Sequence, residues 1–125
     1  MQTKDQERAR KAYEIVKAVI IEPDKKKKSK FKTLSLKFPS MVMQCGLLQA
    51  LAYCKQKDSS DSSNMYNRLN DWLNSYVTGG DIVEGLAAAD VTIWQYQTTT
   101  REAIAFGVWL KRAAATILSD VKTND

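Results

Sequence analysis

The chain has 125 residues, of which 44% are hydrophobic and 26% charged, a composition that is typical of one globular domain and argues against wholesale disorder. Its net charge of +5 is uneven, because residues 1–37 hold 12 Lys or Arg against 5 Asp or Glu, whereas the remaining residues hold 7 against 9. The absence of histidine excludes histidine bases, Ser-His or Cys-His nucleophiles and histidine-ligated metals.

The chain is predicted to begin with a helix over residues 3–21, followed by a lysine-rich connector. Thr3 and Gln6 form a Thr-x-x-Gln capping box, and apolar residues then recur at helical spacing until Pro23 ends the pattern. Residues 24–32 carry six lysines, whose mutual repulsion predicts a mobile, solvated connector.

The next segment contains the predicted centre of the core. Residues 31–38 fit either a short helix or a strand, and we favour the helix because the rest of the chain offers no partner strand. Residues 41–54 are apolar nearly all round, which predicts a buried central helix. We expect Pro39 in the first turn of this helix, and Gly46 to let a neighbouring helix approach closely.

The last part of the chain is also predicted to be helical. A Ser/Asp loop over residues 58–64 precedes a helix that contains Leu69 and Trp72, and Asp81 caps a short helix after the Gly79-Gly80 break. The longest helix runs from about Asp90 to Leu118. The sequence therefore predicts an all-α fold, a compact single domain over residues 1–125 with a buried central helix and a long C-terminal helix.

Clustered positive charge is the main functional signal. Residues 1–37 are strongly basic, which predicts an acidic partner, and lysines favour phosphate contacts that give affinity without sequence preference. The alternative for each lysine is a solvated side chain. The candidates for nucleic-acid or subunit contact are Arg8, Lys11, Lys25, Lys26, Lys27, Lys28, Lys30, Lys37, Lys111 and Arg112.

Groups that could perform chemistry are scarce. Cys45 and Cys54 form no Cys-x-x-Cys pair, which argues against structural zinc, and we expect both thiols to be buried and inert. Glu84 and Glu102 are isolated carboxylates without a visible acid-base partner, and no segment has the spacing of a phosphate-binding P-loop. No stretch approaches the ~20 apolar residues of a membrane span. We therefore expect a non-enzymatic cytoplasmic protein without metal, cofactor or membrane contact, monomeric when isolated.

Three segments resemble one known family. Phe38-Pro39-Ser40-Met41-Val42, followed by Gly46-Leu47-Leu48-Gln49-Ala50-Leu51-Ala52-Tyr53, resembles one of its signatures. Residues 99–105 leading to Trp109-Leu110-Lys111-Arg112-Ala113-Ala114 resemble its C-terminal signature, and Gln6-Glu7-Arg8-Ala9 with Ala12 resembles its start. The family is the small subunit of the type III-B CRISPR effector, the fifth protein of the Cmr complex. Phe38 and Tyr53 depart from the usual Leu and Phe, and the Lys25–Lys28 run is peculiar to this sequence.

The resemblance implies a helical, non-catalytic subunit that lies beside the backbone subunits of a guide-RNA filament. Its implied partners are other Cmr subunits, further copies of itself, guide RNA and target RNA, while a neighbouring subunit cuts the target. Arg8, Lys111 and Arg112 lie in matching segments and are candidate contacts by resemblance, whereas Lys25–Lys28, Lys30 and Lys37 are candidates by charge alone.

Two other functions remain open from the residues themselves. A helix-turn-helix DNA-binding regulator would need a recognition helix with exposed polar residues, and the most central predicted helix is apolar throughout. A protein-only adaptor would leave the lysines solvated. Trp94 is less constrained than Trp72 and Trp109, which we expect in the core, and could contact a partner protein or a base.

Overall fold

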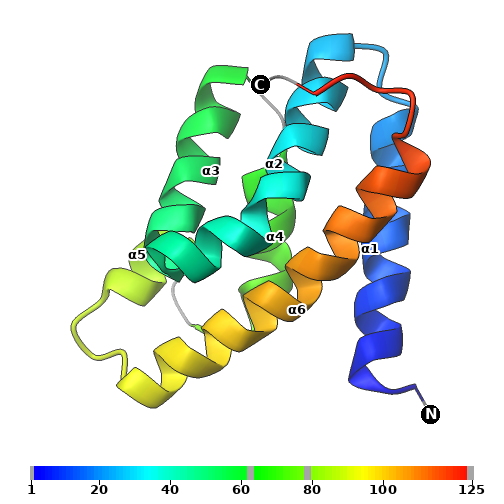
Figure 1. Ribbon diagram of the computed structural model, residues 1–125. Coiled ribbons are helices and arrows are strands. Elements are labelled where there is room, and N and C mark those ends of the chain that lie inside the picture. Colours follow the sequence, from blue (N-terminus) through cyan, green and yellow to red (C-terminus); the bar gives the residue numbers. More distant parts are fainter. Residues whose placement is uncertain (1, 62–63, 78–79, 124–125) are drawn as a thin grey trace.

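The computed structural model describes residues 2–61, 64–77 and 80–123, and these residues form helices and no strand (Figure 1). The all-α prediction and the long C-terminal helix are therefore confirmed. The helices are α1 Lys4–Ile20, α2 Lys25–Cys45, α3 Leu47–Asp61, α4 Met65–Leu73, α5 Ile82–Ala87 and α6 Ile93–Ile117.

Local signals explain the ends of α1. The side chain of Thr3 accepts a hydrogen bond from the amide of Gln6, and the side chain of Gln6 accepts one from the amide of Thr3, so the predicted capping box is present. The helix ends at Ile20, just before Pro23. Ala12 and Val16 are buried, and this face packs against α6.

The predicted mobile connector over residues 24–32 is wrong, because α2 begins at Lys25 and continues to Cys45. The side chain of Asp24 accepts a hydrogen bond from the amide of Lys26 (2.9 Å) and caps the helix. Lysine is itself a good helix former, and α2 buries Phe31 and Phe38 on one face. Capping and burial together outweigh the repulsion between the lysines.

The predicted unbroken helix over residues 41–54 is also wrong. These residues are helical, but they belong to two helices that meet at Gly46, whose φ of +88° is a conformation that favours glycine. Pro39 consequently lies inside α2 and not in a first turn. Among the described residues, none would lie within 4 Å of a Cβ added at Gly46. The close approach occurs at Gly107 on α6, where an added Cβ would lie 2.9 Å from Cδ2 of Phe38.

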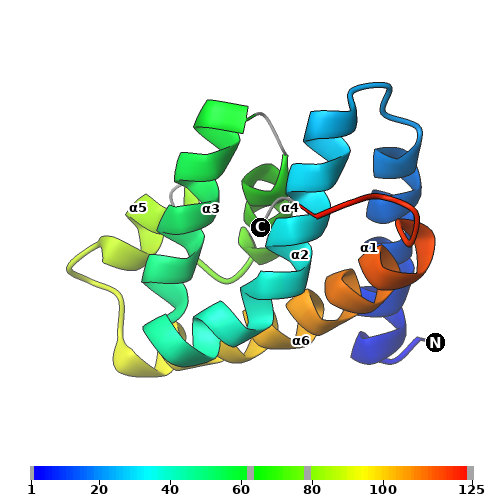
Figure 2. The same cartoon turned by 45° about the horizontal axis from the view of Figure 1, so that its top comes forward.

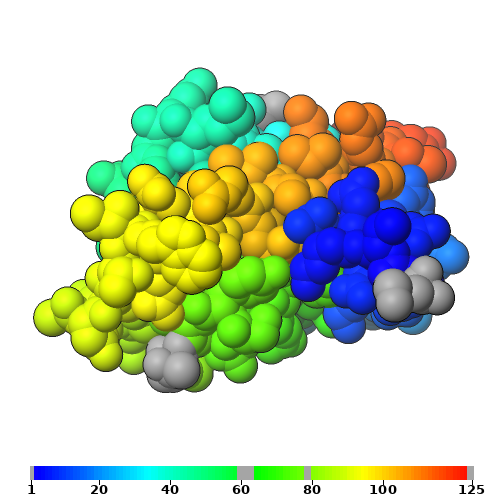
Figure 3. Space-filling view, turned by 90° about the horizontal axis from the view of Figure 1, so that it is seen from below, coloured from blue at the N-terminus to red at the C-terminus, as the bar shows by residue number. Residues whose placement is uncertain are grey.

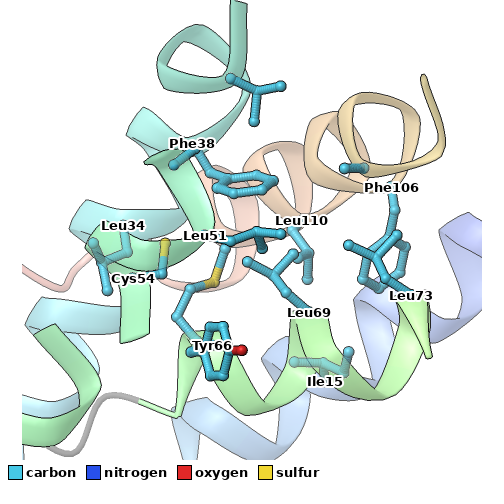
Figure 4. Packing of buried hydrophobic residues seen from close by; sticks show 14 of the residues in the cluster. Ile15, Leu34, Phe38, Leu51, Cys54, Tyr66, Leu69, Leu73, Phe106 and Leu110 are labelled. Carbon is cyan, nitrogen blue, oxygen red and sulfur yellow. The ribbon is translucent and has the colours of Figure 1, made fainter. Parts of the chain in front are cut away.

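Helix α6 runs across the molecule and has its most extensive contacts with α2 and α1, while α3 packs on α2 and α4 (Figures 1 and 2). The core between these helices is made of closely packed side chains that include Phe38, Leu51, Leu69 and Leu110 (Figure 4). Trp72 stacks on Phe106 with ring centroids 4.4 Å apart, and Trp72 and Trp109 pack against the core as expected.

Several predicted boundaries shift by a few residues. Helix α3 continues to Asp61, so it includes part of the predicted loop, and residues 62–63 of that loop lie outside the described residues, as does Gly79. Asp81 caps α5 as predicted, because its side chain accepts from the amide of Glu84. The cap of α6 is Thr92, not Asp90, and its hydroxyl accepts from the amide of Gln95 (3.0 Å).

Candidate nucleic-acid interface

The first turns of α2 and the segment after α6 form a basic hollow, which we call the lysine-rich surface. The C-terminal segment crosses beside the start of α2 (Figure 1). Four lysines line the hollow with a single acidic side chain, and its lining residues are Lys25, Lys26, Lys28, Ser29, Asp120, Val121 and Lys122. Among the side chains that the structure describes (residues 2–58, 64–77 and 80–123), no carboxylate forms an ion pair with any of these lysines.

The position of these lysines raises the positive potential further. The first turn of α2 contains no acidic residue, and the amides at a helix N-terminus carry partial positive charge. Lysines there repel the helix dipole, typically by a few tenths of a kcal/mol each. The carboxylate of Asp24, the cap, offsets part of this charge at the start of the helix. A phosphate placed at this surface would be attracted both by the lysine side chains and by the helix dipole.

Two hydrogen bonds hold the C-terminal segment on α2. The hydroxyl of Ser29 donates to the carbonyl oxygen of Lys122 (2.5 Å), and the ammonium of Lys32 donates to that of Val121 (2.8 Å). These contacts bring Lys122 beside Lys25 and Lys28. Sequence reasoning missed Lys122, because 93 residues separate it from Ser29 and no local pattern joins the two.

The other predicted lysines do not line this hollow. Lys27 faces a separate depression with Glu22 and Arg68, where α1, α2 and α4 meet. Lys30 and Lys37 lie further along α2. The remaining candidates, Lys11 on α1 and both Lys111 and Arg112 on α6, are exposed. The last two are within about 10 Å, measured along the helix axis, of the end of α6 that leads into the lysine-rich surface.

Arg8 has a structural partner that the sequence did not reveal. Its Nε donates to Oε2 of Glu102 (2.9 Å) and its Nη2 to Oε1 (2.7 Å), a bidentate pair between α1 and α6. The indole of Trp72 also donates to Oε2 (2.7 Å). Arg8 remains a predicted contact residue, but its guanidinium is already committed to this buried carboxylate. The interpretation of Glu102 as an isolated carboxylate was wrong.

Opposing effects set the ionisation of this network. Burial acts to raise the pKa of Glu102, but hydrogen bonds from Arg8 and Trp72 outweigh it, and the pKa lies below its ordinary value. The hydrogen bond to Glu102 likewise raises the pKa of Arg8. Both groups are therefore charged near neutral pH. The network joins α1, α4 and α6 and fixes the positions of these helices.

The remaining reactive groups are dispersed. Cys54 is buried, and burial raises the pKa of its thiol to about 12, whereas Cys45 is exposed, so the prediction of two buried thiols was wrong for Cys45. The part of the chain that the structure describes holds no group of three or more Cys, Asp or Glu side chains that could bind a metal ion. No helix within this part is long and apolar enough to span a membrane.

Comparisons with known proteins place the chain in a family. The family model described as CRISPR-associated protein (Cas_Cmr5) matches residues 4–117. The chain is 31% identical over 120 residues to the CRISPR system Cmr subunit Cmr5 of Thermus thermophilus, and the match covers 96% of this chain and 100% of that protein. It is also similar to the crystal structure of a CRISPR-associated Cmr5 family protein from the same organism, with a TM-score of 0.72, 30% identity and coverage of 93% of this chain and 98% of that one. On the strength of these matches, the chain belongs to the Cmr5 family of CRISPR-associated proteins.

Proposed function

We propose that the chain is a non-catalytic small subunit of a type III-B CRISPR effector, the Cmr complex, and that its lysine-rich surface binds the backbone of guide or target RNA. In this proposal it stacks with further copies of itself along a filament, beside the other Cmr subunits. The observation that carries the RNA-binding part is the lysine-rich surface itself, where Lys25, Lys26, Lys28 and Lys122 line one hollow and pair with no carboxylate among the described residues.

The chemistry of this surface suits phosphates better than bases. Lysine ammonium groups on long flexible side chains bind phosphates as point charges and do not read base edges. The described residues that line the hollow include no aromatic side chain on which a base could stack. Binding here would be indifferent to sequence, which suits an RNA-guided complex, because base pairing between guide and target supplies the specificity.

The proposed role requires no bond-breaking step from this chain. Its partly buried charged pair, Arg8 with Glu102, joins α1 to α6. The cutting of target RNA would belong to a neighbouring subunit. The protein would act by charge and shape alone, and its partners would be other Cmr subunits, guide RNA and target RNA.

The test is a salt series of binding to short fluorescent single-stranded RNAs of unrelated sequence. We expect weak binding with a log-log salt slope of about −2 to −4, because ~3–6 phosphate contacts contribute about 0.7 each. The variant Lys25→Glu/Lys26→Glu should weaken binding at least about tenfold and flatten the slope by more than about 1 unit. Lys4→Glu/Arg101→Glu changes the net charge equally on another face and serves as the matched control.

Each contrary outcome points to another function. A wild-type slope near zero would favour a protein-only adaptor, and a strong preference for one duplex DNA sequence would favour a DNA-binding regulator. Equal loss of RNA binding in the two charge-matched variants would mean that overall charge, and not the lysine-rich surface, is responsible.

A further inference from the structure

The first half of α6 presents an exposed face that differs in chemistry from the lysine-rich surface. Ile93, Gln97, Thr100 and Arg101 recur at i, i+4, i+7 and i+8, so they share one side of the helix. Together with Tyr96 they line a hollow on the surface. We call these residues and the adjacent Trp94 the α6 face.

Two large apolar side chains are exposed at its start. The exposed fraction is 78% for Ile93 and 70% for Trp94, the first two residues of α6. Figure 3 shows α6 running across one side of the molecule, with its start next to the α2–α3 junction and the start of α1 beside a later part of the helix. The apolar residues therefore lie on an accessible surface, and a core position does not explain them.

Two hydrogen bonds tie the start of α6 to neighbouring elements. The phenol oxygen of Tyr96 accepts a hydrogen bond from the amide of Leu48 (3.0 Å), which joins the start of α6 to the start of α3. The side-chain amide of Gln95 donates to the carbonyl oxygen of Tyr76 (3.2 Å), which joins it to the segment after α4. An exposed tryptophan on such a fixed helix is pre-organised for binding.

Arg101 supplies an unsatisfied positive charge. It lines the hollow beside Ile93 and also a second hollow on the α1 side, together with Lys4 and Arg8. Glu102, the carboxylate of that second hollow, is already bound by Arg8 and Trp72. Among the described side chains of residues 2–58, 64–77 and 80–123, none forms an ion pair or hydrogen bond with the side chain of Arg101. Arg101, which is exposed, therefore contributes to both hollows.

We propose that the α6 face is a protein-docking surface whose occupant is a segment of a neighbouring subunit that carries both apolar side chains and a carboxylate. The apolar side chains pack on Ile93 and Trp94, and the carboxylate forms an ion pair with Arg101. This inference rests on the proposed function, because it requires that the chain works among other protein subunits.

The composition of the face favours a protein over RNA. Trp, Tyr and Arg are enriched at the centres of protein interfaces and Lys is depleted there. The residues described for the α6 face include an aliphatic side chain and no lysine, whereas the lysine-rich surface has four lysines. An RNA site built on Trp94 would stack bases and would need a row of cations to follow the backbone. Of the cations near this face, Lys4 pairs with Glu7 and Arg8 with Glu102, so Arg101 does not form such a row with them.

The experiment uses a Cmr complex assembled from its other subunits and a guide RNA but lacking this chain. A photoreactive residue replaces Gln97, the chain is added, and irradiation shows what lies against the face. We expect crosslinks to a protein segment that contains Asp or Glu. In parallel, Trp94→Ala/Arg101→Glu should bind this complex at least about tenfold more weakly, while its binding to free RNA stays unchanged. Ile21→Ala, which truncates another exposed apolar residue, is the matched control.

The outcomes separate the two proposals. Crosslinks to RNA, or none to any partner, would overturn the docking surface, as would equal incorporation of wild type and the double variant. Failure of the wild-type chain to join the complex would overturn the proposed function and this inference together. If wild type and the double variant join the complex equally well, only the docking surface is overturned and the proposed function stands. Circular dichroism verifies that each variant is folded.

Discussion

The two ends of α6 present surfaces of opposite character. At the C-terminal end, the lysine-rich surface gathers Lys25, Lys26, Lys28 and Lys122, which form no ion pair with any described carboxylate. At the N-terminal end, the α6 face combines two exposed apolar side chains and a tyrosine with an exposed guanidinium. The first surface suits long-range attraction to a polyanion, and the second suits short-range packing against a protein. Under the two proposals, one small domain would contact two kinds of partner at once.

The two surfaces also differ in what lies beneath them. The α6 face borders the buried network of Arg8, Trp72 and Glu102, whereas the lysine-rich surface is built on an exposed first helical turn capped by Asp24. Substitutions beneath the first should therefore cost much more stability than substitutions at the second.

Loss of the buried carboxylate should have the largest effect. Glu102→Ala leaves Arg8 and the indole of Trp72 without their acceptor, and we expect the free energy of unfolding to fall by about 3 kcal/mol in urea titrations. The double variant Arg8→Leu/Glu102→Leu removes both charges and should lose less than Glu102→Ala. If the double variant loses more stability than Glu102→Ala, the attraction between the two charges contributes more free energy than their desolvation costs.

The same network predicts how stability depends on pH. The pKa of Glu102 is lower in the folded protein than its ordinary value of about 4.5, so its contribution is fully present above that value. The contribution is lost as pH falls through the folded pKa. Wild type should therefore lose more stability than Glu102→Ala when urea titrations are compared at pH 6 and pH 3. Equal losses would assign the acid sensitivity to other carboxylates.

Removal of the cap on α2 should lower stability by a smaller amount and should increase RNA affinity. Asp24→Ala loses the hydrogen bond to the amide of Lys26, and we expect unfolding to become easier by about 1 kcal/mol. RNA affinity should rise, because the variant also loses the carboxylate next to the lysines. Asp24→Ser keeps a capping oxygen without charge and should raise affinity at little cost in stability. A fall in affinity in both variants would contradict the lysine-rich surface as an RNA site.

The smallest effect on stability is expected from Lys111→Glu/Arg112→Glu. Both side chains are exposed on α6, so the free energy of unfolding should change by no more than about 0.5 kcal/mol and helicity should be unchanged. Incorporation into the complex or retention of target RNA should weaken. A loss of circular dichroism signal would show that these residues have a structural role.

Elements defined by local signals were predictable from the sequence. The capping box of α1 and the cap of α5 involve residues three positions apart, and the length of α6 follows from a sustained apolar pattern. The secondary structure of the lysine-rich segment was not predictable from charge alone. Repulsion argued for a solvated connector, but a single cap at Asp24 and the burial of Phe31 and Phe38 made it helical.

The candidate site was only partly predictable, because it depends on distant contacts. Lys25, Lys26 and Lys28 are visible as a run, whereas Lys122 joins them through hydrogen bonds that span 89 and 93 residues. The two members of the buried ion pair between α1 and α6 are 94 residues apart. One signal could have indicated that pair: a lone carboxylate among the apolar residues of a predicted buried helical face requires a cation or hydrogen-bond donors nearby.

Because α6 connects the two surfaces as one continuous helix, its length fixes the distance between their partners. From Trp94 to Ile117 the axis rises about 35 Å, at about 1.5 Å per residue. Each residue inserted into this helix would lengthen that interval and rotate one surface relative to the other by about 100°. An assembly that engages both surfaces must therefore match this spacing and this angle, and under the two proposals α6 would set the separation between the RNA and the protein neighbour.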